Sequence, residues 1–276
     1  NSQWPKNAPY AVCLTHDVDF YSKWWPKRIA SYLIKKRKIG EMLNSIGKKE
    51  YANFEKTMDI EKKLGYKSTF FFRSAKKDAG PKYNIKRAKT DIKNIYENGW
   101  EVGLHAGIHS STNVKNLIKE KERLEQILGN TAYGIRNHLI RFNIKKTWEN
   151  QEKAGFKYDS TLGFRDTIGF RPGFCHPYKP YDFTTKKPYT LLELPMTIMD
   201  IRLLSFEKPI IEFSNIVEEI KKYNGLLVIN WHQCSFDEKD YPERLELYTY
   251  MLKKFHQDNA YVDTCKNITN FWQGKY

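Results

Sequence analysis

Short apolar runs alternate with helix-periodic segments along most of this 276-residue chain, and this order limits the folds available to it. Between the runs, apolar residues recur at spacings of three and four, the pattern of helices with one buried face. Repeated strand-then-helix order predicts an α/β fold with a parallel sheet, either open or closed into a barrel. The predicted strands are 11–15, 68–72, 101–105, 132–136, 158–162, 191–194 and 226–231, with a weaker one at 261–262.

Two long connections interrupt this order. Residues 20–65 form a basic segment that includes Trp24, Trp25 and Lys35–Lys38, and residues 163–188 are aromatic and rich in Gly and Pro. Connections of this length are usually functional or disordered, and in parallel α/β folds the loops after the strands build the site. Because the chain has no internal repeat or low-complexity linker, we expect a single domain over residues 1–276.

The charge is concentrated near one end of the chain. The formal net charge is +15, of which residues 1–100 contribute +12, with 22 basic and 10 acidic residues. The remaining two-thirds are nearly balanced, so we expect no nucleic-acid partner. A contact between the basic N-terminal third and an anionic surface remains compatible with the sequence, although such runs are more often solvated faces.

The cysteines and the apolar runs indicate where in the cell the protein is expected to be found. Cys13, Cys175, Cys234 and Cys265 form no C-x-x-C pair, which argues against a cysteine zinc knuckle. Four cysteines in a chain of this length indicate reduced thiols, so we expect a cytoplasmic protein; a trimmed exported form fits the same sequence. The longest apolar runs are too short for a transmembrane segment.

Potential metal ligands and acid–base groups follow three of the predicted strands. Asp17 and Asp19 end the first strand and share one face of an extended chain. His105 and His109 end the third, at a spacing that brings two imidazoles together if the chain turns helically. His232 follows the strand 226–231. One carboxylate and two histidines make a divalent-metal site with open positions, and a second carboxylate beside it can act as a base.

Each of these signals has a simpler interpretation. An Asp-x-Asp pair is more often a turn or a helix cap, and a lone histidine after an apolar strand is usually a hydrogen-bonded interior group. An isolated H-x-x-x-H is about as often a helix face as a metal site. Their joint placement at the carboxyl ends of three strands favours an active site.

These ordered motifs resemble the polysaccharide deacetylase family, also called NodB-homology or carbohydrate esterase family 4 enzymes, over nearly the whole chain. The matching segments are Thr15-His16-Asp17-Val18-Asp19, His105-Ala106-Gly107-Ile108-His109, Gly134-Ile135-Arg136-Asn137-His138 and Leu227-Val228-Ile229-Asn230-Trp231-His232. The resemblance implies a distorted (β/α) barrel that uses a divalent metal to remove acetyl groups from sugars.

The resemblance also implies a role for each matched residue. It makes Asp17 the general base, Arg136 the group that orients this base, and His232 the general acid. It makes Asp19, His105 and His109 the metal ligands. The open coordination suits zinc best, and ligands of this type also accept cobalt, nickel or manganese.

The sequence departs from the family pattern at several positions. Ser110 replaces the proline that usually follows the second metal histidine, and the Pro-Tyr that usually follows Arg136 is absent. The Asp-Trp expected after Tyr158-Asp159-Ser160 is also missing, so Asp159 and Asp166 are both candidates for tuning His232. These differences indicate a divergent branch with an unusual substrate.

Four further residues are predicted to bind substrate, namely Arg171, His176, His138 and Trp231. Arg171 and His176 lie in the 163–188 connection, which we interpret as a substrate lid; a structured turn with a capped histidine is the alternative.

The leading hypothesis is a metal-dependent hydrolase that removes an N-acetyl or O-acetyl group from a sugar in a polysaccharide or glycan precursor. One alternative is hydrolysis of another C–N bond, as in a formyl sugar or a small amide, at the same metal site. Another is a carbohydrate-binding pseudoenzyme. Folding alone does not require three histidines and two carboxylates at one rim, and this argues against the pseudoenzyme.

Overall fold

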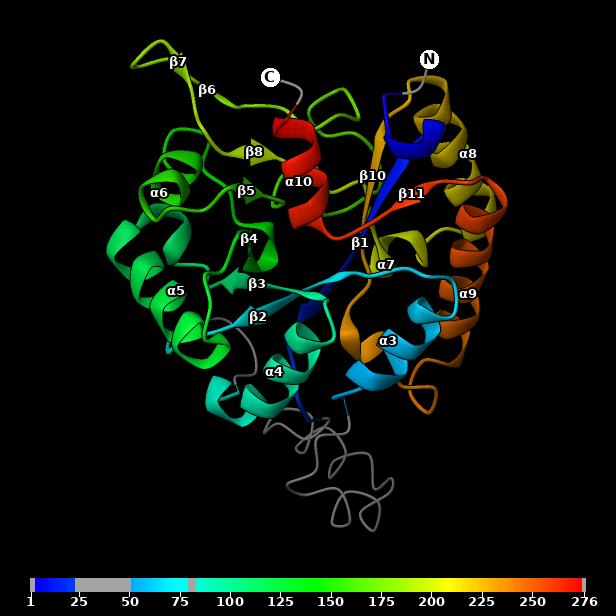
Figure 1. The fold of residues 1–276 in the computed structure, drawn as a ribbon, viewed down its shortest axis with the longest axis horizontal. Helices are drawn as coiled ribbons and strands as arrows, with labels where there is room; N and C mark the ends of the chain where they lie inside the picture. Colours follow the sequence, from blue (N-terminus) through cyan, green and yellow to red (C-terminus); the bar gives the residue numbers. More distant parts are fainter. Residues whose placement is uncertain (1–2, 23–50, 79–82, 275–276) are drawn as a thin grey trace.

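A curled parallel sheet forms the centre of the molecule, and helices surround it (Figure 1). The computed structural model describes residues 3–22, 51–78 and 83–274. Within them the strand order is β8-β5-β4-β3-β2-β1-β10-β9, with β11 paired to β1, and the ladders of this sheet are parallel. The strands are β1 (Ala11–Val18), β2 (Thr69–Arg73), β3 (Glu101–Ala106), β4 (Gly134–Asn137), β5 (Tyr158–Asp159), β8 (Leu192–Glu193), β9 (Ile198–Met199), β10 (Leu226–Asn230) and β11 (Tyr261–Val262).

The helices cover the outside of the sheet. In Figure 1, α4, α5 and α6 lie on one side of the molecule and α8 and α9 on the other, and both termini are at the same end. Gly129 ends α5 with a left-handed φ of 73°, as expected for a glycine cap. The helices are α3 (Phe54–Lys62), α4 (Lys89–Glu97), α5 (Val114–Leu128), α6 (Thr147–Lys153), α7 (Asp200–Leu203), α8 (Pro209–Lys222), α9 (Pro242–Gln257) and α10 (Cys265–Gln273).

The side chains of β1 alternate between two parts of the core. Val12 and Leu14 pack in the outer cluster that includes residues of α8 and α9, whereas Ala11 and Cys13 pack in the inner cluster that includes residues of α10. Successive side chains of a strand point to opposite faces. Continuing this alternation along β1 places Asp17 on the inner face, toward the mouth of the half-barrel.

The α/β barrel prediction is confirmed, and the predicted strands correspond to those observed. Three strands were not predicted: β9 and the two strands of a hairpin, β6 (Tyr181–Asp182) and β7 (Lys187–Pro188), which lies in the 163–188 connection. A two-residue strand shows no periodic pattern of its own, and these three, unlike β5, β8 and β11, do not lie in a segment that the sequence marks as a strand. The basic residues Lys35–Lys38 and the pair Trp24 and Trp25 lie outside the described residues. In residues 3–22, 51–78 and 83–274, no helix is long and apolar enough to cross a membrane.

Candidate metal centre

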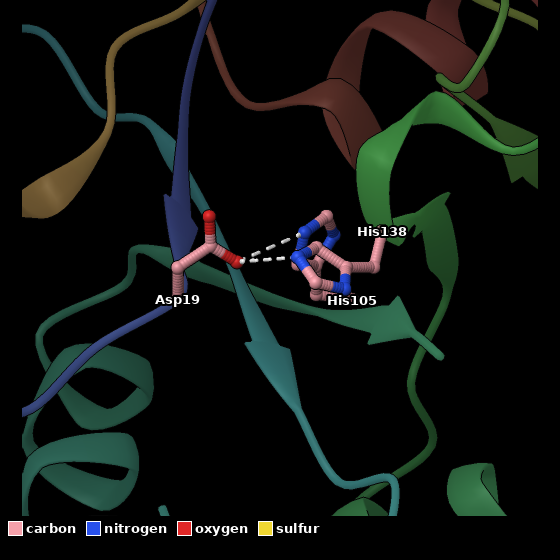
Figure 2. A group of neighbouring side chains, drawn as sticks. All are labelled: Asp19, His105 and His138. Atoms are coloured by element: carbon pink, nitrogen blue, oxygen red, sulfur yellow. Dashed lines mark ion pairs between the residues drawn. The ribbon is translucent and has the colours of Figure 1, made fainter. Parts of the chain in front are cut away.

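Three side chains from different parts of the sheet converge at its carboxyl edge (Figure 2). Asp19 follows β1, His105 belongs to β3, and His138 begins the 3₁₀ turn directly after β4. One ligand atom from each lies within 4.8 Å of the others. The Nε2 atoms of His105 and His138 lie 3.4 and 3.5 Å from the same Asp19 oxygen, Oδ1.

Both histidines are held through their other ring nitrogen. His105 Nδ1 is 3.0 Å from the carbonyl oxygen of Arg136, and His138 Nδ1 is 3.0 Å from Asp78 Oδ2. A carbonyl or carboxylate oxygen only accepts hydrogen bonds, so Nδ1 is the protonated nitrogen in each ring. This tautomer leaves the Nε2 lone pairs facing Asp19, the arrangement typical of metal-binding histidines.

The donor set fits a divalent cation. Asp19 Oδ1 is buried and accepts no hydrogen bond from the described residues, so this anionic oxygen lies between two imidazoles with only the Arg73 guanidinium, 4.0 Å away, as a cationic neighbour. Burial raises the pKa of Asp19, whereas positive charge at the neighbouring imidazoles, above all His105, outweighs this effect and lowers the pKa below its usual value; with neutral imidazoles that charge would come from the bound cation. Two imidazole nitrogens and a carboxylate oxygen are the ligand types that zinc and related metals accept.

The position of His109 differs from the sequence prediction. After β3 the chain enters a 3₁₀ turn (Ser110–Thr112), not the α-helical turn that would bring His105 and His109 together. The buried Ser110 hydroxyl donates to Glu120 at 2.7 Å, and His109 beside it is exposed. His138, predicted to bind substrate, takes the third place in the cluster.

Asp17 lies next to the cluster in a fixed orientation. Arg136 Nη1 donates to its Oδ1 at 3.0 Å and Asn230 Nδ2 donates to its Oδ2 at 2.7 Å. Arg136 is itself fully buried and donates to Thr15 and Ser160. Burial raises the pKa of Asp17, but His105 and Arg136 more than compensate and lower it, so this carboxylate is ionised.

His232 lies on the other side of Asp19, with its Nε2 3.8 Å from Asp19 Oδ2. Its Nδ1 is 2.7 Å from Asp200 Oδ1, at the start of α7. Burial lowers the pKa of His232, but Asp200 outweighs burial and raises the pKa to about 9.

The residue that tunes His232 is therefore Asp200, and neither sequence candidate takes this position. Asp159 bonds to Thr161 inside the core, and Asp166 is exposed. Asp200 was not predicted as a site residue because it follows β9, a two-residue strand that was itself not predicted. Asp78 was also missed, since its pairing with His138 is purely tertiary.

Three predicted substrate-binding residues make other contacts. His176 contacts the carbonyl of Tyr223, and the carbonyl of its neighbour Cys175 accepts from Leu226, the first residue of β10. His176 thus lies at the end of β10 opposite to His232. Trp231 is fully buried in the core beside Tyr248. The exposed Arg171 donates to the carbonyl of Gly163.

The fold matches solved structures closely. A Mycobacterium smegmatis protein assigned as a polysaccharide deacetylase aligns with a TM-score of 0.69 and 22% identity over 99% of this chain and 93% of that chain. This chain has the polysaccharide deacetylase fold. Sequence comparison finds no matching family model and no matching curated protein.

The polysaccharide deacetylase fold serves proteins with different activities. Puue allantoinase aligns with a TM-score of 0.67 and 14% identity over 100% of this chain and 94% of its own. A CE4 family pseudoenzyme from Bacillus anthracis aligns with a TM-score of 0.51 and 11% identity over 94% of this chain and 65% of its own. Fold likeness at these identities leaves the activity to be argued from the site.

Proposed function

We propose that this protein is a metal-dependent hydrolase that removes an acetyl group from the nitrogen or oxygen of a sugar. One observation carries the proposal: an ionised carboxylate and a protonated imidazole, Asp17 and His232, flank a group of ligands suited to a divalent metal. Zinc is the best match to these ligands, and cobalt, nickel and manganese are the alternatives.

Asp19, His105 and His138 would hold the metal. When bound, such an ion polarises a carbonyl group and lowers the pKa of a water molecule, which supplies the electrophile and the nucleophile for amide or ester hydrolysis. His105 and His138 each present a neutral Nε2, because their Nδ1 protons are used in hydrogen bonds.

Asp17 acts as the general base in this proposal. It takes a proton from the attacking water, and Arg136 and Asn230 hold its two oxygens in place. Because the low pKa of Asp17 keeps it ionised, it is ready to accept this proton at neutral pH.

His232 acts as the general acid. Asp200 orients its ring and favours the protonated form, which gives a proton to the leaving amine or alkoxide as the C–N or C–O bond breaks. The acetyl group leaves as acetate, and the sugar retains its amine or hydroxyl.

Two other functions remain candidates. The likeness to an allantoinase supports hydrolysis of another C–N bond, in a formyl sugar or a small amide, by the same groups. The likeness to a pseudoenzyme supports sugar binding without catalysis. The acid, base and ligand positions are all filled in this chain, and for this reason we favour an enzyme.

The test is acetate release from N-acetylated and O-acetylated glycans, beside a formyl sugar and allantoin. The protein is purified without chelator, its metal content is measured, and Asp17→Asn is the matched control. We expect metal-dependent acetate release that EDTA abolishes and zinc restores. Release only from the formyl sugar or allantoin would favour the second candidate, and glycan binding without turnover would favour the pseudoenzyme.

A further inference from the structure

Asp78 is a buried carboxylate just after β2 that connects three separate segments. Its Oδ2 accepts from Arg73 Nη2 at 2.9 Å and from His138 Nδ1 at 3.0 Å, and its Oδ1 accepts from the backbone N–H of Ile108 at 3.0 Å. Its side chain is 0% exposed. We propose that Asp78 is a positioning residue that makes His138 the third metal ligand by fixing the orientation and tautomer of its ring.

This inference rests on the proposed metal site, and it identifies Asp78 as a residue that sets how tightly that site binds a metal ion. Carboxylates that accept from the distal nitrogen of a metal-bound histidine raise its basicity and fix its orientation. Asp78 meets the geometric condition, because its bond to Nδ1 leaves His138 Nε2 facing Asp19 (Figure 2).

The backbone at His138 explains why the ring needs such a partner. Leu139 and Ile140 follow it with φ values of 55° and 43°, in the left-handed region that residues other than glycine rarely adopt, β-branched ones such as Ile140 least of all. Leu139 is also 46% exposed, so burial of its side chain does little to hold the turn. Strained backbone of this kind persists only where surrounding contacts fix it, and Asp78 supplies one of them.

Gly107 lies in the loop after β3 and packs closely against Ala75 and Glu120. A Cβ atom added at Gly107 would lie 2.8 Å from Ala75 Cβ and 3.1 Å from Glu120 Oε1, with Asp78 Cγ at 3.4 Å, an ordinary contact distance. The N–H of Gly107 donates to Glu120, which also accepts from Ser110. Glu120 therefore anchors the same loop as Asp78, and within the described part of the chain no interaction joins it to His138, which makes it a suitable comparison.

The experiment measures metal affinity, because this quantity does not depend on the unidentified substrate. Asp78→Asn keeps the size of the side chain but replaces one acceptor oxygen with a donor, so it cannot satisfy all three N–H groups. We expect Zn²⁺ binding, measured by chelator competition, to weaken by about 10- to 100-fold. Glu120→Gln is expected to lower the melting temperature while leaving Zn²⁺ affinity within about twofold of the original.

A double-mutant cycle separates positioning from a general loss of structure. If Asp78 acts through His138, Asp78→Asn has no further effect on Zn²⁺ affinity in a His138→Ala background. An equal loss in both backgrounds, or unchanged affinity in the Asp78→Asn protein, would overturn the proposal. If Asp78→Asn does not fold, Asp78→Glu replaces it: the longer side chain keeps the charge but shifts the carboxylate relative to His138 Nδ1, and the same loss of affinity is expected.

Failure of the metal site itself gives a different result. If the original protein binds no Zn²⁺, Co²⁺, Ni²⁺ or Mn²⁺, the proposed function is wrong and the assignment of Asp78 falls with it. If the original protein binds metal and Asp78→Asn binds it equally well, only the role of Asp78 is wrong.

Discussion

Asp200 accepts two hydrogen bonds from His232, one from the ring Nδ1 at 2.7 Å and one from the backbone N–H at 3.0 Å. The same carboxylate accepts from the Ser235 hydroxyl at 2.5 Å and lies 3.9 Å from Arg244 Nη1. The imidazole is therefore fixed in both position and tautomer, and its Nε2 lies 3.8 Å from Asp19 Oδ2 in the candidate metal centre.

The first prediction concerns Asp200→Asn. Removing the carboxylate charge lowers the pKa of His232, so the general acid loses its proton at lower pH. We expect the alkaline limb of the pH–rate profile to move to lower pH and turnover at pH 8 to fall about tenfold or more. Metal content, measured by elemental analysis, should stay the same. An unchanged alkaline limb would separate Asp200 from catalysis.

His232→Ala should affect amides more than activated esters. An amine leaving group needs a proton, whereas an activated ester has a leaving group that hardly does. We expect a folded, metal-loaded variant whose kcat falls by about 100-fold or more on an N-acetyl sugar and much less on an activated acetyl ester. Equal losses on the two substrates would indicate that His232 binds substrate instead.

Asp17 and Asp19 should respond differently to the same change. Asp17→Asn should keep the metal and reduce kcat by about two or more orders of magnitude, the usual scale for loss of a general base. Asp19→Asn should weaken metal binding, because it removes the anionic ligand. Elemental analysis beside kinetics tests both, and the opposite pattern would exchange the two roles.

The two candidate third ligands can be compared directly. His138→Ala should weaken Zn²⁺ binding by about 100-fold or more, because it removes a ligand held only 3.5 Å from Asp19. His109→Ala, at an exposed position, should leave Zn²⁺ affinity within about twofold. Chelator competition measures both. Loss of Zn²⁺ binding in His109→Ala alone would instead make His109 the third metal ligand, as the sequence predicts.

A buried carboxyl pair away from the metal site should make stability pH-dependent. Burial raises the pKa of Asp159 to about 6 and also raises that of Glu193, which faces it. Each carboxyl has a higher pKa in the folded protein than in the unfolded chain, so its protonated form stabilises the fold below about pH 4. This contribution is lost as the pH rises through about 6. Stability should therefore fall from pH 5 to pH 8.

Asp159→Asn tests this dependence. Asp159 Oδ1 accepts from Thr161, and an asparagine oxygen can keep that bond while its amide faces Glu193. We expect a gain on the order of 1–2 kcal/mol at pH 8 and a smaller change at pH 5. Thermal unfolding at pH 5 and pH 8 measures this gain. The same change in melting temperature at the two pH values would contradict the raised pKa values of Asp159 and Glu193.

The sequence predicts the sheet well, because strands buried on both faces are visible as apolar runs. Asp19 and His105, which end such runs, lie together as the strand order predicts. The proximity of His138 to Asp19 was not predicted, because a strained 3₁₀ turn, with φ of 55° at Leu139, brings it there. Spacing along the chain predicts convergence only where the backbone is regular.

His176 shows a second limit of the sequence. The connection that carries it returns to the first residue of β10, where Leu226 bonds to Cys175. Its position depends on contacts between residues about 50 positions apart, which local patterns do not record. The same limit applies to Asp78 and Asp200, whose partners are distant in sequence.

Asn230 forms two bonds with Asp17, accepting from its backbone N–H and donating to its carboxylate. These bonds require the parallel register that pairs Thr15 with Asn230. A slip of one residue would turn the amide to the other face of the sheet and place an apolar Ile229 or Trp231 side chain opposite the carboxylate. The amide bonds are therefore available only when β1 and β10 are correctly aligned, so they favour the register that brings Asp17 and His232 to the same end of the sheet.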